Sequence, residues 1–260
     1  MLVYGAMQPY TDIFCFSTTR HGGFSEGAYA SFNCNGYCGD RHETVARNRE
    51  LLCGLLPQRP ETLLIPHQTH GTEVRTVDEA FLQLPDAART EALEGVDALM
   101  TRIPGQCLCI STADCIPVLC YDRRLRAVAA VHAGWRGTVA RIVGKTLRQM
   151  GEVYGTRPED VVACIGPGIS LDAFEVGDEV YQAFCEAGFP MERIARRDSK
   201  WHLDLWEANR LQLLEQGVPE AQVSVAGICT YRQNDRFFSA RRQGIRSGRI
   251  LSGILLMHPF

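Results

Sequence analysis

Short apolar runs separated by turn residues recur through the middle of the chain. The runs between residues 62 and 133 are "TLLIP", "TEVRTV", "VDALMT", "CLCIST", "IPVLCYD" and "RAVAAVHA". Runs of this length, rich in Val, Ile and Leu, are typical of strands with buried faces. Four more strands are predicted outside this region, at "DIFCFSTTR", "DVVACIG", "VSVAGIC" and "RILSGILLM". The pattern therefore predicts extensive β-sheet.

Helical spacing of apolar residues marks residues 40–56. Asp40 can cap this helix, and Glu43 follows three residues later, as in a capping box. The predicted buried face consists of Val45, Asn48, Leu51, Leu52 and Leu55. Asn48 is the polar exception on that face, and we expect it to hydrogen-bond to neighbouring backbone rather than to a ligand.

Three further helices are predicted, over residues 137–150, 176–188 and 203–217. In the first, Gly151 is the expected C-cap. Helices and strands interleave without a strict strand-helix-strand alternation, which favours an α+β fold with mixed β-sheets flanked by helices. We expect a single compact domain over residues 1–260, without repeats or linkers.

Composition narrows the possible partners. The chain has 45% hydrophobic residues and a formal net charge of -3. Such a small charge creates no field that attracts nucleic acid or acidic lipid, so a small or neutral partner is expected. The N-terminal segment lacks the pattern of a signal peptide, and no stretch is long and apolar enough to span a membrane. A cytoplasmic protein is predicted, and its oligomeric state, monomer or dimer, stays open.

The chain contains eleven cysteines, an odd number, and is too long to depend on disulfides as small secreted domains do. Reduced, buried cysteines are therefore expected. Cys107 and Cys109 lie two residues apart in a predicted strand and should share one face of it.

Three predicted strands run directly into polar clusters that contain His or Cys, namely "LLIPHQTHG", "CISTADC" and "AAVHAGWRG". Strand ends often converge to build a site, which would bring together His70 (or His67), Cys115 and His132. Two imidazoles and a thiolate suit zinc or copper and leave a coordination position open. Asp114 or Gln68 would then orient a ligand.

The same residues allow two other interpretations. In a Cys-His hydrolase, Cys115 would be the thiolate and His132 the base, with Asp114 or another acid orienting the imidazole. In a purely structural role, Cys115 would be a core thiol. The spacing of the three residues matches no local metal-binding pattern, so the residues alone leave these alternatives open. Arg136, in the Gly-rich turn "HAGWRG", either binds an anion at a helix N-terminus or is simply exposed.

Several motifs together carry a resemblance to a known family. They are "STTRHGGFSEGAYASFN", "QTHG", "TADCIPVLCYD", "AAVHAGWRGTVARIV", "CIGPGIS", "FEVGDEV" and "HLDLWEANRLQLLEQGV". In this order they resemble the laccase-domain family, also called polyphenol-oxidase-type purine nucleoside phosphorylases, over nearly the whole chain. The family motif Gln-Val-His-Gly selects His70 over His67. Here Thr69 replaces the valine and His67 is additional. We expect His67 to be a neighbour of the site rather than a ligand, and whether it assists, for example as a proton relay, stays open.

The resemblance implies a zinc site made by His70, Cys115 and His132. It also implies phosphorolysis of adenosine, inosine, guanosine or methylthioadenosine, together with adenosine deamination. Arg20 and Asn33 flank the loop that matches the N-terminal motif, and with Arg136 they are predicted to contact phosphate, ribose or base. Some relatives are described as peptidoglycan editing factors, which leaves a cytoplasmic hydrolase as the alternative. A multicopper oxidase needs on the order of ten imidazoles, and this chain has seven histidines without an HxH pair.

Overall fold

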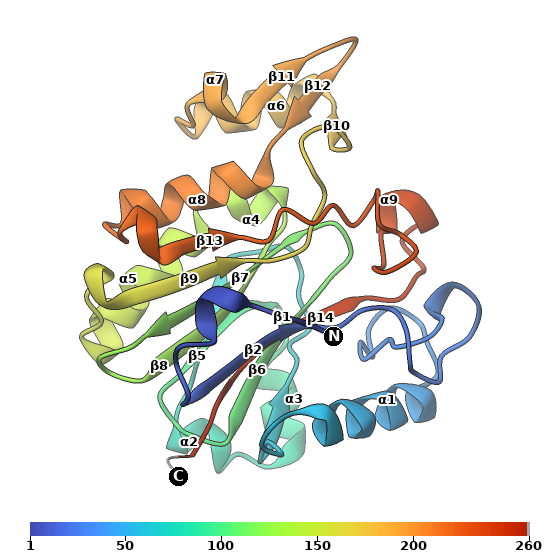
Figure 1. The fold of residues 1–260 in the computed structure, drawn as a ribbon, viewed down its shortest axis with the longest axis vertical. Coiled ribbons are helices and arrows are strands. Elements are labelled where there is room, and N and C mark those ends of the chain that lie inside the picture. Colours follow the sequence, from blue (N-terminus) through green and yellow to red (C-terminus); the bar gives the residue numbers. More distant parts are fainter. Residues whose placement is uncertain (259–260) are drawn as a thin grey trace.

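The structure, a computed structural model, describes residues 1–258. Two central β-sheets pack face to face, and helices cover the outer face of each, so that the main body has four layers (Figure 1). Both sheets contain parallel and antiparallel neighbours. The predicted α+β fold with mixed sheets flanked by helices is confirmed.

The first sheet has five strands, in which β3 is parallel to β6 and the other neighbours are antiparallel. In spatial order they are β1 (Leu2–Val3), β2 (Ile13–Ser17), β14 (Ile250–Leu256), β6 (Gln106–Thr112) and β3 (Thr62–Leu64). The second sheet has six strands, in the order β13 (Val223–Val225), β9 (Val161–Ile165), β7 (Ile116–Asp122), β8 (Ala127–Ala133), β5 (Val96–Thr101) and β4 (Glu73–Val77).

Strand alternation explains how this core is built. Along β6, Leu108 and Ile110 pack between the two sheets, whereas Cys107 and Cys109 face the helix on the outer side. The two thiols lie 3.6 Å apart on that face, as the sequence predicts. All eleven cysteines are free and seven of them are buried, in agreement with the expectation of reduced core thiols.

Helices cover the outer faces of the two sheets. On the five-stranded sheet lies α1 (His42–Leu55), and on the six-stranded sheet lie α4 (Trp135–Val139), α5 (Ile142–Tyr154) and α8 (Leu205–Glu215). Shorter helices are α2 (Glu79–Leu82), α3 (Asp86–Ala92) and α9 (Ala240–Gln243), and single 3-10 turns occur at Gly5–Met7, Gly27–Tyr29, Pro158–Asp160 and Glu220–Gln222. Among the described residues no helix is both long and apolar enough to cross a membrane.

The predicted start and buried face of α1 need correction. Asp40 does not cap this helix, because its carboxylate accepts hydrogen bonds from the side chains of Ser25 and Asn33 instead. Leu55 is exposed rather than buried. The side-chain amide of Asn48 bonds to the backbone of loop residues Phe24 and Asn33, as predicted.

The helix predicted over 137–150 is two helices. The chain turns at Arg141, whose φ of 60° is left-handed and interrupts the helical hydrogen bonding between α4 and α5. The second helix also continues past the predicted C-cap Gly151 and ends at Gly155, which adopts the left-handed conformation that favours glycine.

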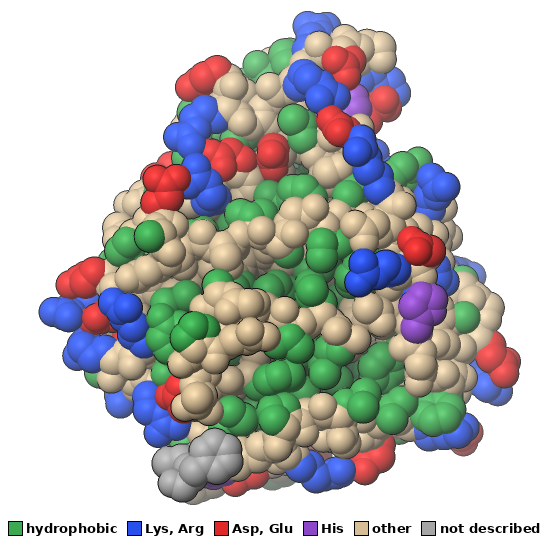
Figure 2. All heavy atoms as spheres, in the orientation of Figure 1, with side chains coloured by type: hydrophobic (Ala, Val, Ile, Leu, Met, Phe, Trp, Pro, Cys, Tyr) green, Lys and Arg blue, Asp and Glu red, His purple; other side chains and the backbone are tan. Residues whose placement is uncertain are grey.

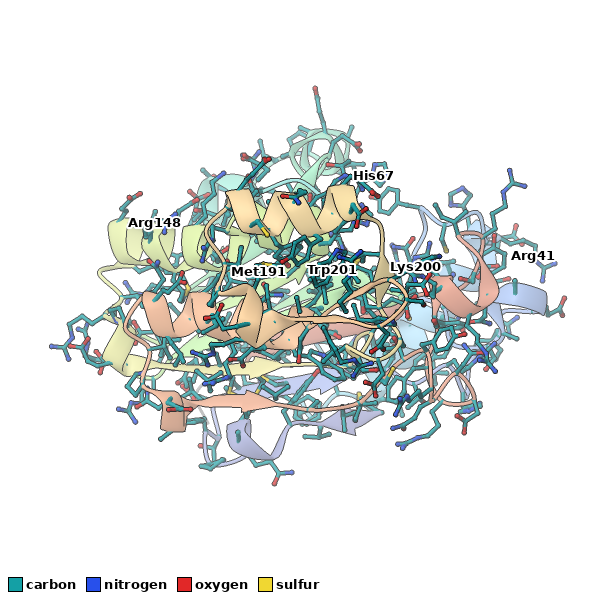
Figure 3. All side chains as sticks on the ribbon, turned by 90° about the horizontal axis from the view of Figure 1, so that it is seen from above. Arg41, His67, Arg148, Met191, Lys200 and Trp201 are labelled. Carbon is teal, nitrogen blue, oxygen red and sulfur yellow. The ribbon has the colours of Figure 1, made fainter. Side chains whose placement is uncertain are left out.

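A small outer lobe, residues 175–203, stands at the top of Figure 1. It contains α6 (Asp178–Glu186), α7 (Met191–Ile194) and an antiparallel sheet in the order β10 (Glu175–Val176), β12 (Trp201–Leu203), β11 (Ala195–Arg197). Trp201, which Figure 3 labels, belongs to this lobe. Its ring stacks on that of Tyr181 with the centroids 3.7 Å apart. Figure 2 shows charged side chains of both signs gathered on this lobe, above a body whose visible face carries many hydrophobic side chains.

Candidate metal centre

His70, Cys115 and His132 come together although they are far apart in sequence. One ligand atom from each lies within 4.8 Å of the others. His132 lies near the end of β8, Cys115 in the turn between β6 and β7, and His70 in the segment between β3 and β4. Within residues 1–258 no other cluster of three or more His, Cys, Asp or Glu side chains is placed to hold a metal ion.

Asp97 on β5 is the partner of His132. Strands β5 and β8 pair antiparallel through Ala98 and Val131, and one residue further Asp97 Oδ1 lies 2.7 Å from His132 Nδ1. The aspartate is completely buried and His132 is 3% exposed. A carboxylate only accepts hydrogen bonds, so Nδ1 donates the proton and Nε2 is left to face Cys115.

The same carboxylate also shapes the segment that carries His70. The backbone N–H groups of Thr69, His70 and Gly71 all donate to Asp97, at 3.3, 3.1 and 2.7 Å. These bonds hold His70 at a φ of 63°, the left-handed region that non-glycine residues rarely adopt. Asp97 therefore fixes two of the three side chains of the centre at once.

The charges of the centre reinforce each other. Burial by itself raises the pKa of the Cys115 thiol, but the nearby imidazoles of His132 and His70 outweigh it and lower that pKa to about 6. Burial likewise disfavours the charged form of His132, whereas Cys115 and Asp97 raise its pKa to about 9. At neutral pH the metal-free centre therefore holds a thiolate beside an imidazolium.

The centre fits a metal ion by its donors and by its shape. A thiolate and two imidazoles are the borderline-soft donors that zinc and copper prefer. Gly134 forms the wall behind them, since a Cβ placed there would lie 3.0 Å from both Cys115 Sγ and His70 Cδ2. The three donors are graded in exposure, from the buried His132 to the exposed His70. An ion held there would thus keep a side open to ligands.

That open side faces a cavity of about 240 Å³. Segments far apart in sequence line it, and the residues used below are Tyr37, His67, His70, Cys115, His132, Ile245 and Arg249. His67 is a neighbour of the three-residue group and not a member of it.

The structure places the three predicted substrate contacts outside this cavity lining. Arg20 donates hydrogen bonds to the backbone oxygens of Ala30 and Asn234. Arg136 is exposed, with its guanidinium 4.3 Å from the ring centroid of Trp135. Asn33 is fully buried and accepts a hydrogen bond from the backbone N–H of Arg249 at 3.1 Å.

Asp114 and Gln68, which were predicted to orient a metal ligand, bond to other parts of the chain instead. Asp114 accepts hydrogen bonds from Thr230, Ser239 and the backbone of Arg241, so it ties the Cys115 turn to the C-terminal segment. Gln68 bonds to the backbone of Ser111. Sequence reasoning missed Asp97, although a lone aspartate inside the apolar strand "VDALMT" was a usable signal, because a buried carboxylate requires partners.

Comparison with known proteins identifies the family of this chain. The family model described as multi-copper polyphenol oxidoreductase laccase matches residues 14–257. A purine nucleoside phosphorylase of Bacteroides thetaiotaomicron is 58% identical over 98% of this chain and 96% of its own length. Adenosine deaminase RL5, from an unknown prokaryotic organism, is 41% identical over 92% of each chain. The crystal structure of YlmD from Geobacillus stearothermophilus superposes with a TM-score of 0.88 at 33% identity, covering 96% of this chain and 94% of that one.

The fold and the site thus define a laccase-domain protein with one His-Cys-His centre. The chain belongs to this family, as its motifs indicate.

Proposed function

We propose that this protein is a zinc-dependent purine nucleoside phosphorylase. Its substrates would be adenosine, inosine, guanosine and methylthioadenosine, with phosphate as the second substrate. The observation that carries the proposal is the His70, Cys115 and His132 group, open on one side to a cavity. The name of the 58% identical relative supports the choice of reaction.

In phosphorolysis, an oxygen of phosphate forms a bond to C1′ of the ribose. The N-glycosidic bond breaks, and its electron pair leaves with the base, which takes up a proton. A zinc ion bound at the centre would polarise an oxygen of a substrate or lower the pKa of a bound water. The chain itself holds the donors: Asp97 keeps the proton on His132 Nδ1, and Cys115 is a thiolate at neutral pH.

We assign Cys115 the role of ligand rather than nucleophile. With His132 and Asp97 it resembles a Cys-His-Asp triad, in which Asp97 is the acid that orients the imidazole. A triad has no use for a second imidazole, however, and His70 lies in the same group. Three converging donors are the number that a catalytic zinc site uses.

Arg249 is the arginine that lines the cavity, which makes it our choice for binding phosphate. Its guanidinium also donates to the backbone oxygens of Ile245 and Gly248, so its position is fixed by its own segment. Contacts of Arg20, Asn33 and Arg136 with substrate stay predictions, and their present partners suit a role in holding the surrounding loops.

The deciding experiment uses full-length protein stripped of metal and reloaded with zinc or copper. Inosine is supplied with and without phosphate, and hypoxanthine and ribose 1-phosphate are measured. We expect hypoxanthine release that requires both zinc and phosphate. Release that is independent of phosphate would contradict phosphorolysis. An Arg249→Ala variant with an unchanged phosphate KM would remove that residue from the proposal, and Arg136→Ala is the parallel test for the exposed arginine.

Adenosine deamination is the second activity, which the name of the 41% identical relative favours. Adenosine separates the two reactions, because deamination yields inosine and ammonia whereas phosphorolysis yields adenine. A muropeptide precursor with a wrong first amino acid and a phenol under oxygen are supplied in parallel. Turnover of either of these without turnover of a nucleoside would favour the editing or the oxidase activity instead.

A further inference from the structure

Two aromatic rings from distant parts of the chain stack at the cavity. The rings of Tyr37 and His67 have centroids 4.4 Å apart and planes inclined by 20°. Tyr37 comes from the long N-terminal loop and His67 from the segment after β3. Both line the cavity that contains the metal centre, and neither belongs to the three-residue group.

Both rings of this aromatic pair are accessible to solvent. Tyr37 is 45% exposed and the His67 side chain 38%. A third apolar side chain of the same cavity, Ile245, is 80% exposed. Apolar groups that gather in a concave site beside a few polar groups are typical of ligand contact.

The pair is also held in place before any ligand arrives. Glu94 Oε1 lies 2.6 Å from His67 Nδ1, and the His67 backbone bonds to Leu93 and Gly95. The backbone N–H of Tyr37 donates to the side chain of Asn35 at 2.7 Å. A rigid aromatic face loses little conformational entropy when a flat ligand stacks on it.

We propose that the stacked rings of Tyr37 and His67 form an aromatic shelf, on which the purine ring of the substrate stacks against the outer face of one ring while the other ring supports it from behind. This inference rests on the proposed function. It states which part of the cavity would contact each part of the substrates. The anionic phosphate requires a cation such as Arg249, and the bond that breaks must lie near the metal centre. The flat base is the part of the substrate that gains from an aromatic face, and stacking accepts any purine.

The test compares Tyr37→Leu and His67→Leu with the unaltered chain, all loaded with zinc. Both variants should raise the KM for inosine by about tenfold or more, which corresponds to the loss of one base-aromatic contact. The KM for phosphate and the zinc content should not change. Tyr37→Phe retains the ring and should restore most of the affinity that Tyr37→Leu loses. Uridine, with its smaller ring, should respond less than inosine.

Phe24→Leu is the matched control, because Phe24 is a 42% exposed ring of the same N-terminal loop that lies outside the cavity lining. Calorimetric binding of hypoxanthine to each protein gives a readout that does not need turnover. If the unaltered chain releases no base from any nucleoside, the proposed function fails. The affinity for hypoxanthine in the unaltered chain and in the variants then tests whether Tyr37 and His67 bind a purine ring. Unchanged inosine KM and hypoxanthine affinity in both leucine variants would overturn the inference.

Discussion

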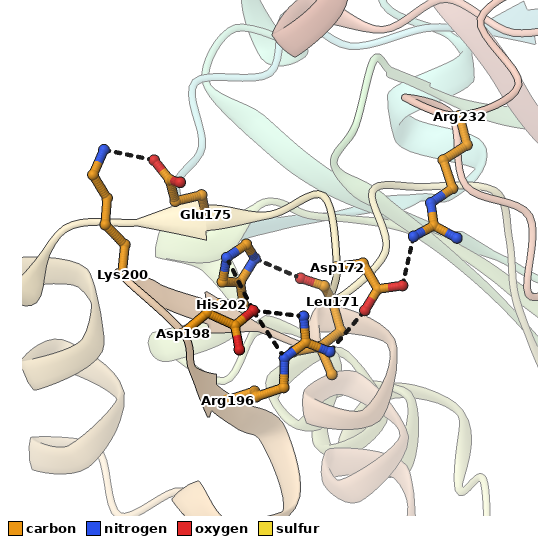
Figure 4. Close-up of polar contacts among 8 residues, drawn as sticks. All are labelled: Leu171, Asp172, Glu175, Arg196, Asp198, Lys200, His202 and Arg232. Carbon is orange, nitrogen blue, oxygen red and sulfur yellow. Dashed lines mark hydrogen bonds and ion pairs between the residues drawn. The ribbon is translucent and has the colours of Figure 1, made fainter.

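Ion pairs at the metal centre and around the outer lobe differ in their burial. The Asp97–His132 pair at the centre is buried, with side-chain exposures of 0% and 3%. Around the lobe, Arg196 pairs with Asp172 and Asp198, while Lys200 pairs with Glu175, as Figure 4 shows. The side chains in these pairs are between 42% and 63% exposed.

The ion pairs of the two regions differ in their exposure to solvent and not in their nitrogen-oxygen distance. The nitrogen-oxygen distance is 2.7 Å for Asp97–His132 and also for Lys200–Glu175. Water screens the pairs around the lobe, and exposed pairs contribute little to stability. At the centre, water cannot replace a lost partner, so removing one member leaves an uncompensated buried charge. The number of ion pairs in a region thus says little about its importance.

The largest effect is expected from Cys115→Ala, which removes the one anionic donor of the centre. The variant should no longer bind stoichiometric zinc, and base release should fall to the background without enzyme. Metal analysis and the phosphorolysis assay check both outcomes. Cys185→Ala, a partly exposed cysteine in the outer lobe, is the control that keeps its zinc. Full zinc occupancy in Cys115→Ala would refute the ligand assignment.

Zinc affinity should depend strongly on pH because ligands must be deprotonated before they bind a metal. The pKa of His132 is raised to about 9, so at lower pH zinc must displace its proton. Between about pH 6 and pH 9 the affinity should therefore rise about tenfold per pH unit, and it should level off above pH 9. Below about pH 6 Cys115 is protonated as well, and the dependence should steepen.

Titration against a chelator of known pH dependence measures this slope. One proton should be released per zinc bound near pH 7.5, which calorimetry in buffers of different ionisation enthalpy detects. A flat profile across this range would mean that the buried pair does not hold the proton that we assign to His132.

Asp97→Asn tests the carboxylate that joins the two histidines. An asparagine has one acceptor oxygen, so its NH₂ group must face either the His132 proton or the backbone N–H groups of Thr69 and Gly71. We expect zinc affinity to fall by about 10- to 100-fold and the free energy of unfolding to fall by about 1–3 kcal/mol. Wild-type zinc affinity in this variant would contradict the positioning role.

Much of the body was predictable because burial leaves a simple signature in the sequence. Strands such as β7 and β8 are mostly apolar and buried along their whole length, and the alternation of side chains along a strand assigns each one to a face. The lobe was missed as a unit because its strands are only two or three residues long, too short for a period to show. The break at Arg141 was missed because an arginine gives no signal of a left-handed turn.

The convergence of His70, Cys115 and His132 was predictable, but the residues that hold them in place were not. His70, Cys115 and His132 follow apolar strands, and the family motifs select them. The partner of His132 depends on the pairing of β5 with β8, which a single sequence does not specify. Asp114, next to Cys115 in sequence, was therefore suggested as the orienting acid, whereas the carboxylate that contacts His132 in space is Asp97. The position of Arg249 in the cavity lining was missed for the same reason.

The smallest effect is expected from Asp172→Asn, the same substitution made at the base of the outer lobe. Asp172 accepts from Arg196 and Arg232, and these cations hold its pKa below the usual value. When its charge is removed, Arg196 still pairs with Asp198, and Arg232 returns to water. Thermal unfolding, zinc content and base release should therefore all stay at the level of the unaltered chain. A fall in the melting temperature of Asp172→Asn as large as that of Asp97→Asn would contradict this expectation. The melting temperature of the unaltered chain in 1 M salt, which screens exposed charges, then gives the cause. If salt does not lower it to a similar extent, the lobe depends on directional hydrogen bonds rather than on screened charges.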